Sequence, residues 1–201
     1  MHRLAQFDAI NRAAGSASEA VVDPPEPGNL PADLLTVLCA ALSEHTSTPD
    51  SCWFGLWEGH GWVYGGVRIV EFSPLDTIVP AATSLVEATD SLSVSSNLLA
   101  AMRDAPRVHL PGRNYLLFEG PVDAATELGW SMPSGGFAPQ SPNLFWPHDH
   151  AWCVASEIDL FCTLVAGSQA LAETLISDPR LEVWPVFPDD PITWDSDDIN
   201  T

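Results

Sequence analysis

The chain contains no lysine, and all seven of its basic residues are arginine. Aspartate and glutamate together number 27, which leaves a formal net charge of −20 at pH 7. Nucleic-acid binding depends on basic side chains that neutralise phosphates, so this charge argues against a DNA or RNA partner. It also opposes binding to an anionic membrane surface. The same charge favours a basic protein partner, and it also keeps an aromatic-rich chain dispersed in water.

The sequence also lacks paired cysteines and any apolar run of membrane-span length. Its four cysteines form no C-x-x-C pair, and each lies in a short apolar stretch: Cys39, Cys52, Cys153 and Cys162. We therefore expect small buried thiols in a reducing compartment. Residues 1–22 hold no continuous apolar stretch of the kind that marks a signal peptide. No segment reaches the length of a membrane span. The sequence predicts a cytoplasmic protein that is not bound to a membrane.

Sequence motifs of common enzyme classes are also absent. The chain has no G-x-S-x-G, no P-loop and no G-x-G-x-x-G motif. The Gly-Gly pairs at 65–66 and 135–136 are typical of turns. No basic cluster lies near a cysteine in the sequence, so a reactive thiolate is not expected. We predict no cofactor and assign no catalytic residue on this basis.

What the chain does have is enough apolar material for one packed domain. It has 201 residues, of which 46% are hydrophobic, with eight tryptophans and eight phenylalanines. We expect an N-terminal extension or linker over residues 1–30, a single domain over 31–186 and an acidic tail over 187–201. Helix and strand patterns alternate irregularly, which indicates an α+β fold with a mainly antiparallel sheet and a few helices packed on it.

The local patterns predict three helices and several strands. Leu34, Leu38 and Leu42 form one stripe of the first helix, and Ser168 is a candidate N-cap of the last. Residues 58–61 predict a hairpin turn. The expected helices are 31–45, 122–128 and 168–176, and the expected strands are 52–57, 62–64, 67–72, two within 108–120, 151–159, 161–166 and 181–186. Residues 129–142 read as a loop, and 73–105 carry little signal.

Two segments hold the candidate binding residues. In the predicted hairpin, Trp53 and Trp57 share one face of a strand. A core face is the favoured interpretation, and an exposed anchor for a partner is the alternative. The segment 142–159 gathers two tryptophans, two histidines, a cysteine and three carboxylates, which are costly to bury without partners. The residues expected to contact a partner are Trp57, Trp62, Asp149, Trp152, Glu157 and Asp159.

Glu157 and Asp159 also suggest acid–base chemistry. In a strand over 152–159 they would lie on one face, about 6–7 Å apart. In such a pair the pKa of one carboxyl group can be raised above that of the other, as acid–base catalysis requires. The pair can also bind a hard cation. The alternative is a solvated strand end or ion pairing with Arg68 or Arg113.

A zinc site is a weaker hypothesis. His148 and His150 flank Asp149 at strand alternation, and Cys153 follows. No second pair of ligands is evident, and the spacing matches no established metal motif. A polar turn that leads into a strand, with Pro147 setting the turn, is the alternative.

Three blocks of sequence carry a resemblance. The segments 48–54, 115–122 and 141–159 resemble an uncharacterised family of acidic actinobacterial proteins, over roughly residues 30–186. That family implies no catalytic residues, and His150 stands where its members are expected to have arginine. The acidity, the early helix and the Trp/Gly-rich hairpin are also loosely similar to SUKH-type immunity proteins, which neutralise toxins by direct binding.

Three functional hypotheses follow. The first is a non-enzymatic acidic binding protein, an immunity protein or regulator that docks on a basic partner such as a toxin. The second is a hydrolase that uses Glu157 and Asp159, with or without a metal. The third is a structural subunit of a homo-oligomer whose tryptophan face forms the interface.

Overall fold

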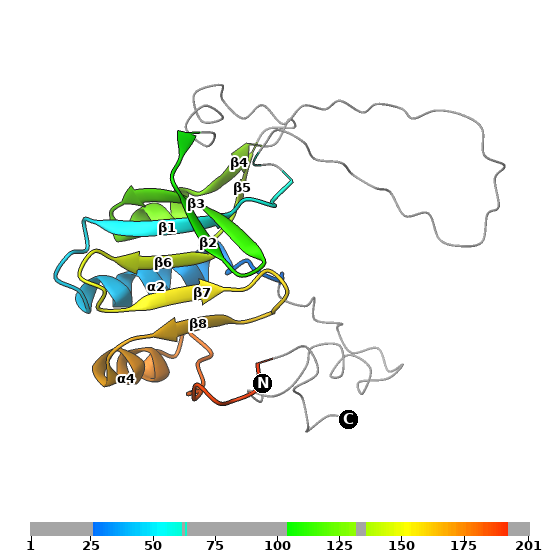
Figure 1. Cartoon of the computed structure of the whole chain (residues 1–201). Helices are drawn as coiled ribbons and strands as arrows, with labels where there is room; N and C mark the ends of the chain where they lie inside the picture. Colours follow the sequence, from blue (N-terminus) through cyan, green and yellow to red (C-terminus); the bar gives the residue numbers. More distant parts are fainter. Residues whose placement is uncertain (1–25, 62, 64–103, 132–135, 193–201) are drawn as a thin grey trace, which may run out of the picture.

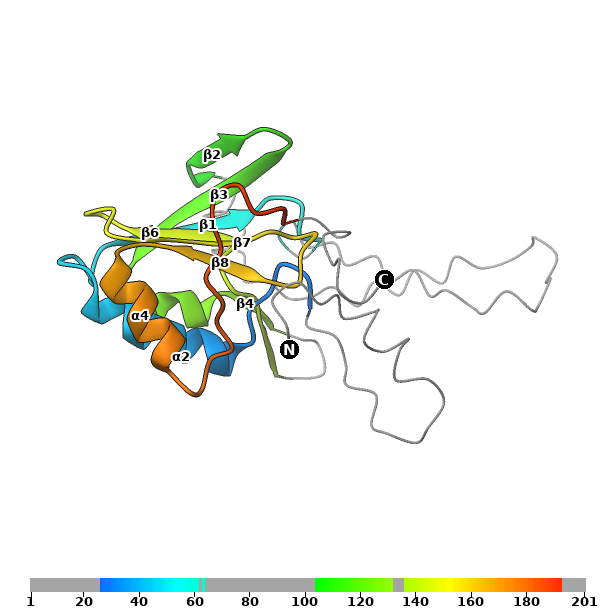
Figure 2. The same ribbon diagram turned by 90° about the horizontal axis from the view of Figure 1, so that it is seen from below.

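The computed structural model describes residues 26–61, 63, 104–131 and 136–192. Its centre is a six-stranded sheet in the order β2-β3-β1-β6-β7-β8, with every neighbouring pair antiparallel. Helices lie against one face of this sheet (Figures 1 and 2). The predicted α+β fold with a mainly antiparallel sheet is confirmed. The elements are α2 (Ala32–Glu44), β1 (Cys52–Trp57), β2 (Arg107–Leu110), β3 (Arg113–Gly120), η1 (Val122–Glu127), β4 (Gly129–Ser131), β5 (Phe137–Pro139), β6 (Leu144–Pro147), β7 (Cys153–Ser156), β8 (Thr163–Ala166) and α4 (Gln169–Ser177).

The core lies between the sheet and the helices. Helix α2 buries Leu35, Leu38 and Leu42, so the stripe predicted from Leu34 is shifted by one residue at its start. From the sheet, Phe54 stacks on Phe145 at 6.0 Å, and Phe145 meets Trp152 edge to face at 5.6 Å. Each such buried side chain contributes about 1.5–3 kcal/mol from apolar burial. The core therefore ties the middle strands of the sheet to α2.

Helix α4 begins as the sequence predicted. The Ser168 side chain accepts a hydrogen bond from the Leu171 backbone N–H, which satisfies one of the unpaired donors at the helix start. Leu171 and Leu175 are buried in the core. The chain after α4 passes along the β8 edge of the sheet (Figure 1). The strand predicted at 181–186 is wrong, because this segment has no strand conformation and pairs with no strand of the described residues.

Strand β1 differs most from its prediction. Its two edges pair with β3 and β6, both distant in sequence, so β1 is a central strand. A return strand at 62–64 was expected to pair with it. Of that segment only Val63 is described, and it lies in a turn. The predicted strand at 67–72 lies outside the described residues. The local sequence pattern predicted that β1 pairs with the segment that follows it. In the structure both neighbours of β1, β3 and β6, are distant in sequence.

Three smaller corrections concern loops. The segment 129–142, expected to be a loop, contains β4 and β5, which form a separate two-stranded sheet. The strand expected over 151–159 is shorter and ends at Ser156. Residues 28–30, placed in the linker, make contacts within the fold: Gly28 has φ 68°, and an added Cβ there would lie 2.6 Å from the Ile158 Cα. Only glycine fits this close approach without displacing the backbone.

Candidate functional site

The sheet has one face that no described helix covers. We call it the open face. The alternation of β1 turns Cys52, Phe54 and Leu56 into the core, whereas Trp53 and Trp57 point the other way and are half-buried. The favoured interpretation of the tryptophans as a core face is therefore wrong. Helices α2 and α4 lie on the same side of the sheet (Figure 2), and Phe54 packs in one core cluster with their buried leucines.

A line of side chains crosses the open face from β3 to β8. Trp53 is paired in register with Glu119 on one side and with Trp146 on the other. Trp146 and Cys153 line a common hollow, and Cys153 pairs with Ala166. We call Glu119, Trp53, Trp146, Cys153 and Ala166 the transverse row. Paired residues in a row lie on one face, so this row presents two neighbouring indoles with a carboxylate at one end.

A second line runs beside the transverse row and contains no polar side chain. The register places Leu117, Gly55, Leu144, Ala155 and Leu164 next to one another across five strands. Gly55 contributes no side chain between the two tryptophans of β1. Apart from Glu119 at one end, the two rows form an apolar surface in which most side chains are half-buried, of the kind found at protein–protein contacts.

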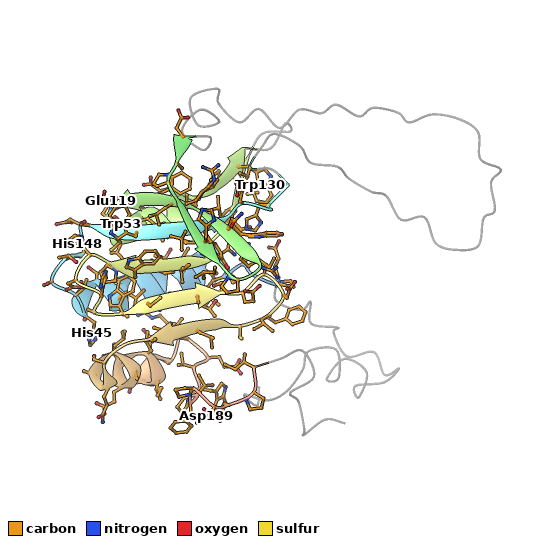
Figure 3. The ribbon with its side chains drawn as sticks, in the orientation of Figure 1. His45, Trp53, Glu119, Trp130, His148 and Asp189 are labelled. Carbon is orange, nitrogen blue, oxygen red and sulfur yellow. The ribbon has the colours of Figure 1, made fainter. Side chains whose placement is uncertain are left out.

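The end of the open face near Glu119 is acidic. Glu119 is exposed, and its Oε1 accepts a hydrogen bond from Ser51 Oγ at 3.1 Å. Among the described residues it has no arginine or histidine partner. Asp50, just before the start of β1, and Asp149, just after the end of β6, are both exposed. Because β1 and β6 are antiparallel, the two residues lie at the same edge of the sheet. Glu119 and Trp53 lie together at this end of the sheet in Figure 3.

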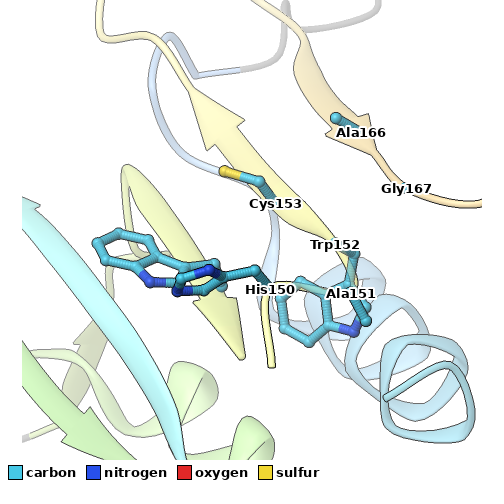
Figure 4. Close-up of a pocket in the computed structure, with 7 residues that line it drawn as sticks. His150, Ala151, Trp152, Cys153, Ala166 and Gly167 are labelled. Atoms are coloured by element: carbon cyan, nitrogen blue, oxygen red, sulfur yellow. The ribbon is translucent and has the colours of Figure 1, made fainter. Parts of the chain in front are cut away.

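The hollow beside Trp146 is shallow and mostly apolar. It has a volume of about 450 Å³ and is lined by Trp146, His150, Ala151, Trp152, Cys153, Ala166 and Gly167. Cys153 on β7 and Ala166 on β8 face it from adjacent strands (Figure 4). Burial raises the pKa of the Cys153 thiol. The thiol therefore stays protonated at neutral pH, and the hollow suits an apolar side chain better than nucleophilic chemistry.

At the opposite end of the open face, Trp57 already has a cation beside it. The Arg113 guanidinium carbon lies 5.8 Å from the Trp57 ring centroid. Arg113 Nη2 reaches Asp159 Oδ2 at 2.6 Å and Glu157 Oε1 at 3.4 Å. These carboxylates lie beyond the end of β7, in a turn rather than on a strand face. The predicted ion pairing with Arg113 is confirmed, and both carboxylates share one cation.

A buried polar cluster holds this end of the sheet together. Asn143 is 3% exposed, and its Oδ1 accepts hydrogen bonds from the Trp57 backbone N–H at 2.9 Å and His60 Nε2 at 3.0 Å. Its Nδ2 donates to the Gly28 and Ser156 carbonyls, each at 3.2 Å. Burial lowers the pKa of His60. Every hydrogen-bonding group of Asn143 is used, so it is a structural junction.

The turn between β6 and β7 contains the predicted histidines. His150 has a left-handed backbone, φ 57°, so His148 and His150 do not alternate along a strand. Asp149 turns its carboxylate to the loop before β1 and accepts bonds from Ser47 N, Ser47 Oγ and Thr46 Oγ1 at 2.7–2.8 Å. No three His, Cys, Asp or Glu side chains of the described part converge as metal ligands.

Not all of the residues predicted to contact a partner lie at the surface of the described structure. Trp152 is 2% exposed, and its Nε1 donates to the Leu42 carbonyl at 3.0 Å, so it is a core residue and not a surface anchor. Trp62 lies outside the described residues. Cys162 is exposed, contrary to the expectation that all four cysteines are buried. Trp146 and Glu119 were not singled out from the sequence, because no local signal shows that both flank Trp53.

Comparison with models of protein families, with curated proteins and with solved structures finds no match to this chain. The resemblances to the actinobacterial family and to SUKH-type proteins stay predictions. Within the described ranges, no helix has both the length and the apolar character needed to cross a membrane.

Proposed function

We propose that this chain is a non-catalytic acidic binding protein, an immunity protein or regulator, that docks on a basic protein through its open face. The observation that carries the proposal is the transverse row, where Trp53 and Trp146 lie side by side, half-exposed, next to Glu119. Tryptophan is the residue type most enriched among strong contributors to protein binding. An adjacent carboxylate adds preference for a positively charged partner.

The charge of the described part supports a basic partner. Arg107, Arg113 and Arg180 are its only arginines, and each is ion paired with a carboxylate. The exposed acids Asp50, Asp123 and Glu127 have no such partner there. A surface of this sign attracts a basic protein and accelerates its encounter.

The two other hypotheses receive less support. The hydrolase requires Glu157 and Asp159 to work as acid and base, yet both contact the same Arg113 nitrogen. The homo-oligomer requires two open faces to meet. Each copy carries a net charge of −20, so electrostatic repulsion opposes that contact.

Capture from native lysate tests the proposal. Tagged wild type is compared with Trp146→Ala, which removes an indole of the transverse row, and with Phe161→Ala, which removes an exposed aromatic ring from the β7–β8 turn. We expect one stoichiometric basic protein, identified by mass spectrometry, that elutes as salt rises. Wild type and Phe161→Ala should retain it, and Trp146→Ala should lose it.

Two results would contradict the proposal: no basic protein held by wild type, or equal capture by all three proteins. Thermal unfolding followed by circular dichroism establishes that both variants fold. Light scattering after size exclusion distinguishes a bound partner from a second copy of the chain.

A further inference from the structure

At one end of the open face an arginine side chain is held by an indole and a carboxylate. Arg113 lies over the Trp57 ring, and its Nη2 bonds to Asp159 Oδ2 at 2.6 Å. Its Nε is buried and has no hydrogen-bond partner among the described residues. The guanidinium is therefore held by an indole and carboxylates, which is a favourable arrangement for this planar cation.

The other end of the same face also has an indole and a carboxylate, and no arginine or histidine of the described residues pairs with this carboxylate. Trp53 lies on β1 four residues before Trp57, so both indoles are on one face of one strand. Glu119 is the direct neighbour of Trp53 on β3. Neighbouring strands are about 4.8 Å apart, so a guanidinium that stacks on Trp53 can reach the Glu119 carboxylate.

Other side chains near Trp53 and Glu119 also favour binding of a long basic side chain. Ser51 Oγ donates to Glu119 Oε1 at 3.1 Å, which helps to fix the carboxylate through one of its two oxygens. Trp146 lies on the far side of Trp53 and offers a second indole for the aliphatic part of a long side chain. Asp50 and Asp149 are exposed at the same end and add negative potential.

We propose that Trp53 and Glu119 form the anchoring site for an arginine side chain of the basic partner. The guanidinium stacks on the Trp53 indole and donates to the Glu119 carboxylate, as Arg113 does with Trp57 and Asp159. This inference rests on the proposed function and identifies the chemistry of its partner. Arginine fits better than lysine because a planar guanidinium can stack and donate at the same time, whereas an ammonium is a compact point charge.

Peptide binding to the full chain tests the site. The probes are capped hexa-arginine and capped hexalysine peptides, titrated by calorimetry at low ionic strength. The proteins are wild type, Trp53→Ala, Glu119→Gln and the control Glu173→Gln. Glu173 is an exposed glutamate on α4, so its variant loses the same charge away from the open face.

We expect wild type to bind hexa-arginine several-fold more tightly than hexalysine. Glu119→Gln and Trp53→Ala should each weaken hexa-arginine binding by about tenfold, the loss expected for one charge-assisted contact. Glu173→Gln should change it by less than about twofold. The indole N–H resonance of Trp53, assigned by its loss in Trp53→Ala, should shift on addition of hexa-arginine.

Other outcomes overturn the inference. Equal affinity for both peptides, with Glu119→Gln matching Glu173→Gln, would show attraction by net charge alone. The proposed docking function could still hold in that case, since partner capture decides it separately. An unmoved Trp53 resonance despite tight binding would place the arginine elsewhere. Absence of binding to either peptide would also reject the anchoring site.

Discussion

Asp149 Oδ2 accepts hydrogen bonds from both the backbone N–H and the side-chain hydroxyl of Ser47, each at 2.7 Å. The two residues are 102 positions apart in the sequence. This contact ties the loop before β1 to the turn between β6 and β7. It fixes the end of the sheet that presents Trp53 and Trp146, so the shape of the open face depends on it.

The first prediction concerns this loop contact. The hydrogen bonds from Ser47 hold the pKa of Asp149 well below its usual range. The contact therefore stabilises the fold at pH values above the unfolded pKa near 4, and the stabilisation is lost as pH falls below that value. Asp149→Asn should lower Tm at pH 7, because an NH2 group, which is itself a donor, replaces one of the two accepting oxygens and faces a set of donors. The exposed Asp189→Asn removes the same charge and should leave Tm unchanged; equal Tm values for the two variants would reject the structural role.

Asn143 carries the second prediction. Its removal leaves the Trp57 N–H and the buried Ser156 carbonyl without this partner, whereas the Gly28 carbonyl keeps a bond from Gln140 Nε2. Each buried unpaired group costs about 1–3 kcal/mol. Asn143→Ala should therefore lower the free energy of unfolding by at least about 2 kcal/mol. Asn114→Ala, at an exposed position, should change it by less than about 1 kcal/mol. Urea denaturation measures both, and similar values for the two would show that the junction is unimportant.

His60 gives the third prediction, on pH. Burial lowers its pKa in the folded protein, so the unfolded chain binds a proton at a higher pH than the native state does. The unfolded state is then favoured as pH falls below about 6.5, and the native state gains stability as pH rises toward 7. Replacement of His60 by Gln should reduce the slope of unfolding free energy between pH 5 and pH 7. An unchanged slope in His60→Gln would exclude His60 as the source.

The fourth prediction separates the core from the open face. Trp152 is fully buried and donates to the Leu42 carbonyl, so Trp152→Ala should cost about 3–5 kcal/mol of unfolding free energy. Trp53 is half-buried, so Trp53→Ala should cost clearly less while it weakens partner binding. Denaturant unfolding and peptide titration of both variants give the comparison. A larger stability loss from Trp53→Ala would mean that the open face is part of the core.

The carboxylates near Arg113 supply the fifth prediction. Asp159 is largely exposed and Glu157 partly exposed, and ion pairs at the surface contribute about 0–1 kcal/mol. Glu157→Gln should therefore change stability by less than about 1 kcal/mol and leave partner capture intact. The hydrolase hypothesis expects a lost phenotype from the same substitution. Arg113→Ala should cost more than Glu157→Gln, because it also removes the contact with Trp57.

Much of the local structure follows from the sequence alone. Helix α2, the Ser168 cap and strand β1 are decided by neighbouring residues, so the sequence predicted each of them, although the α2 stripe begins at Leu35 and not at Leu34. The turn between β2 and β3 is equally local, since Gly112 takes a positive φ of 75° that glycine readily adopts. The candidate site was only partly predictable. Trp57, Glu157 and Asp159 were singled out, but their common partner Arg113 was one of two possibilities.

The sequence by itself determined the charge, the α+β composition and the alternation that divides each strand into two faces. It could not determine which face the helices cover, because a period of two is the same on both sides of a sheet. Only the tertiary structure placed β1 between β3 and β6, and so made Glu119, Trp53 and Trp146 neighbours. Trp53 lies 66 residues before Glu119 and 93 residues before Trp146, so no local signal shows that they are neighbours. Pairing between distant strands, with the burial of Phe54 against α2, decided which tryptophans face outward.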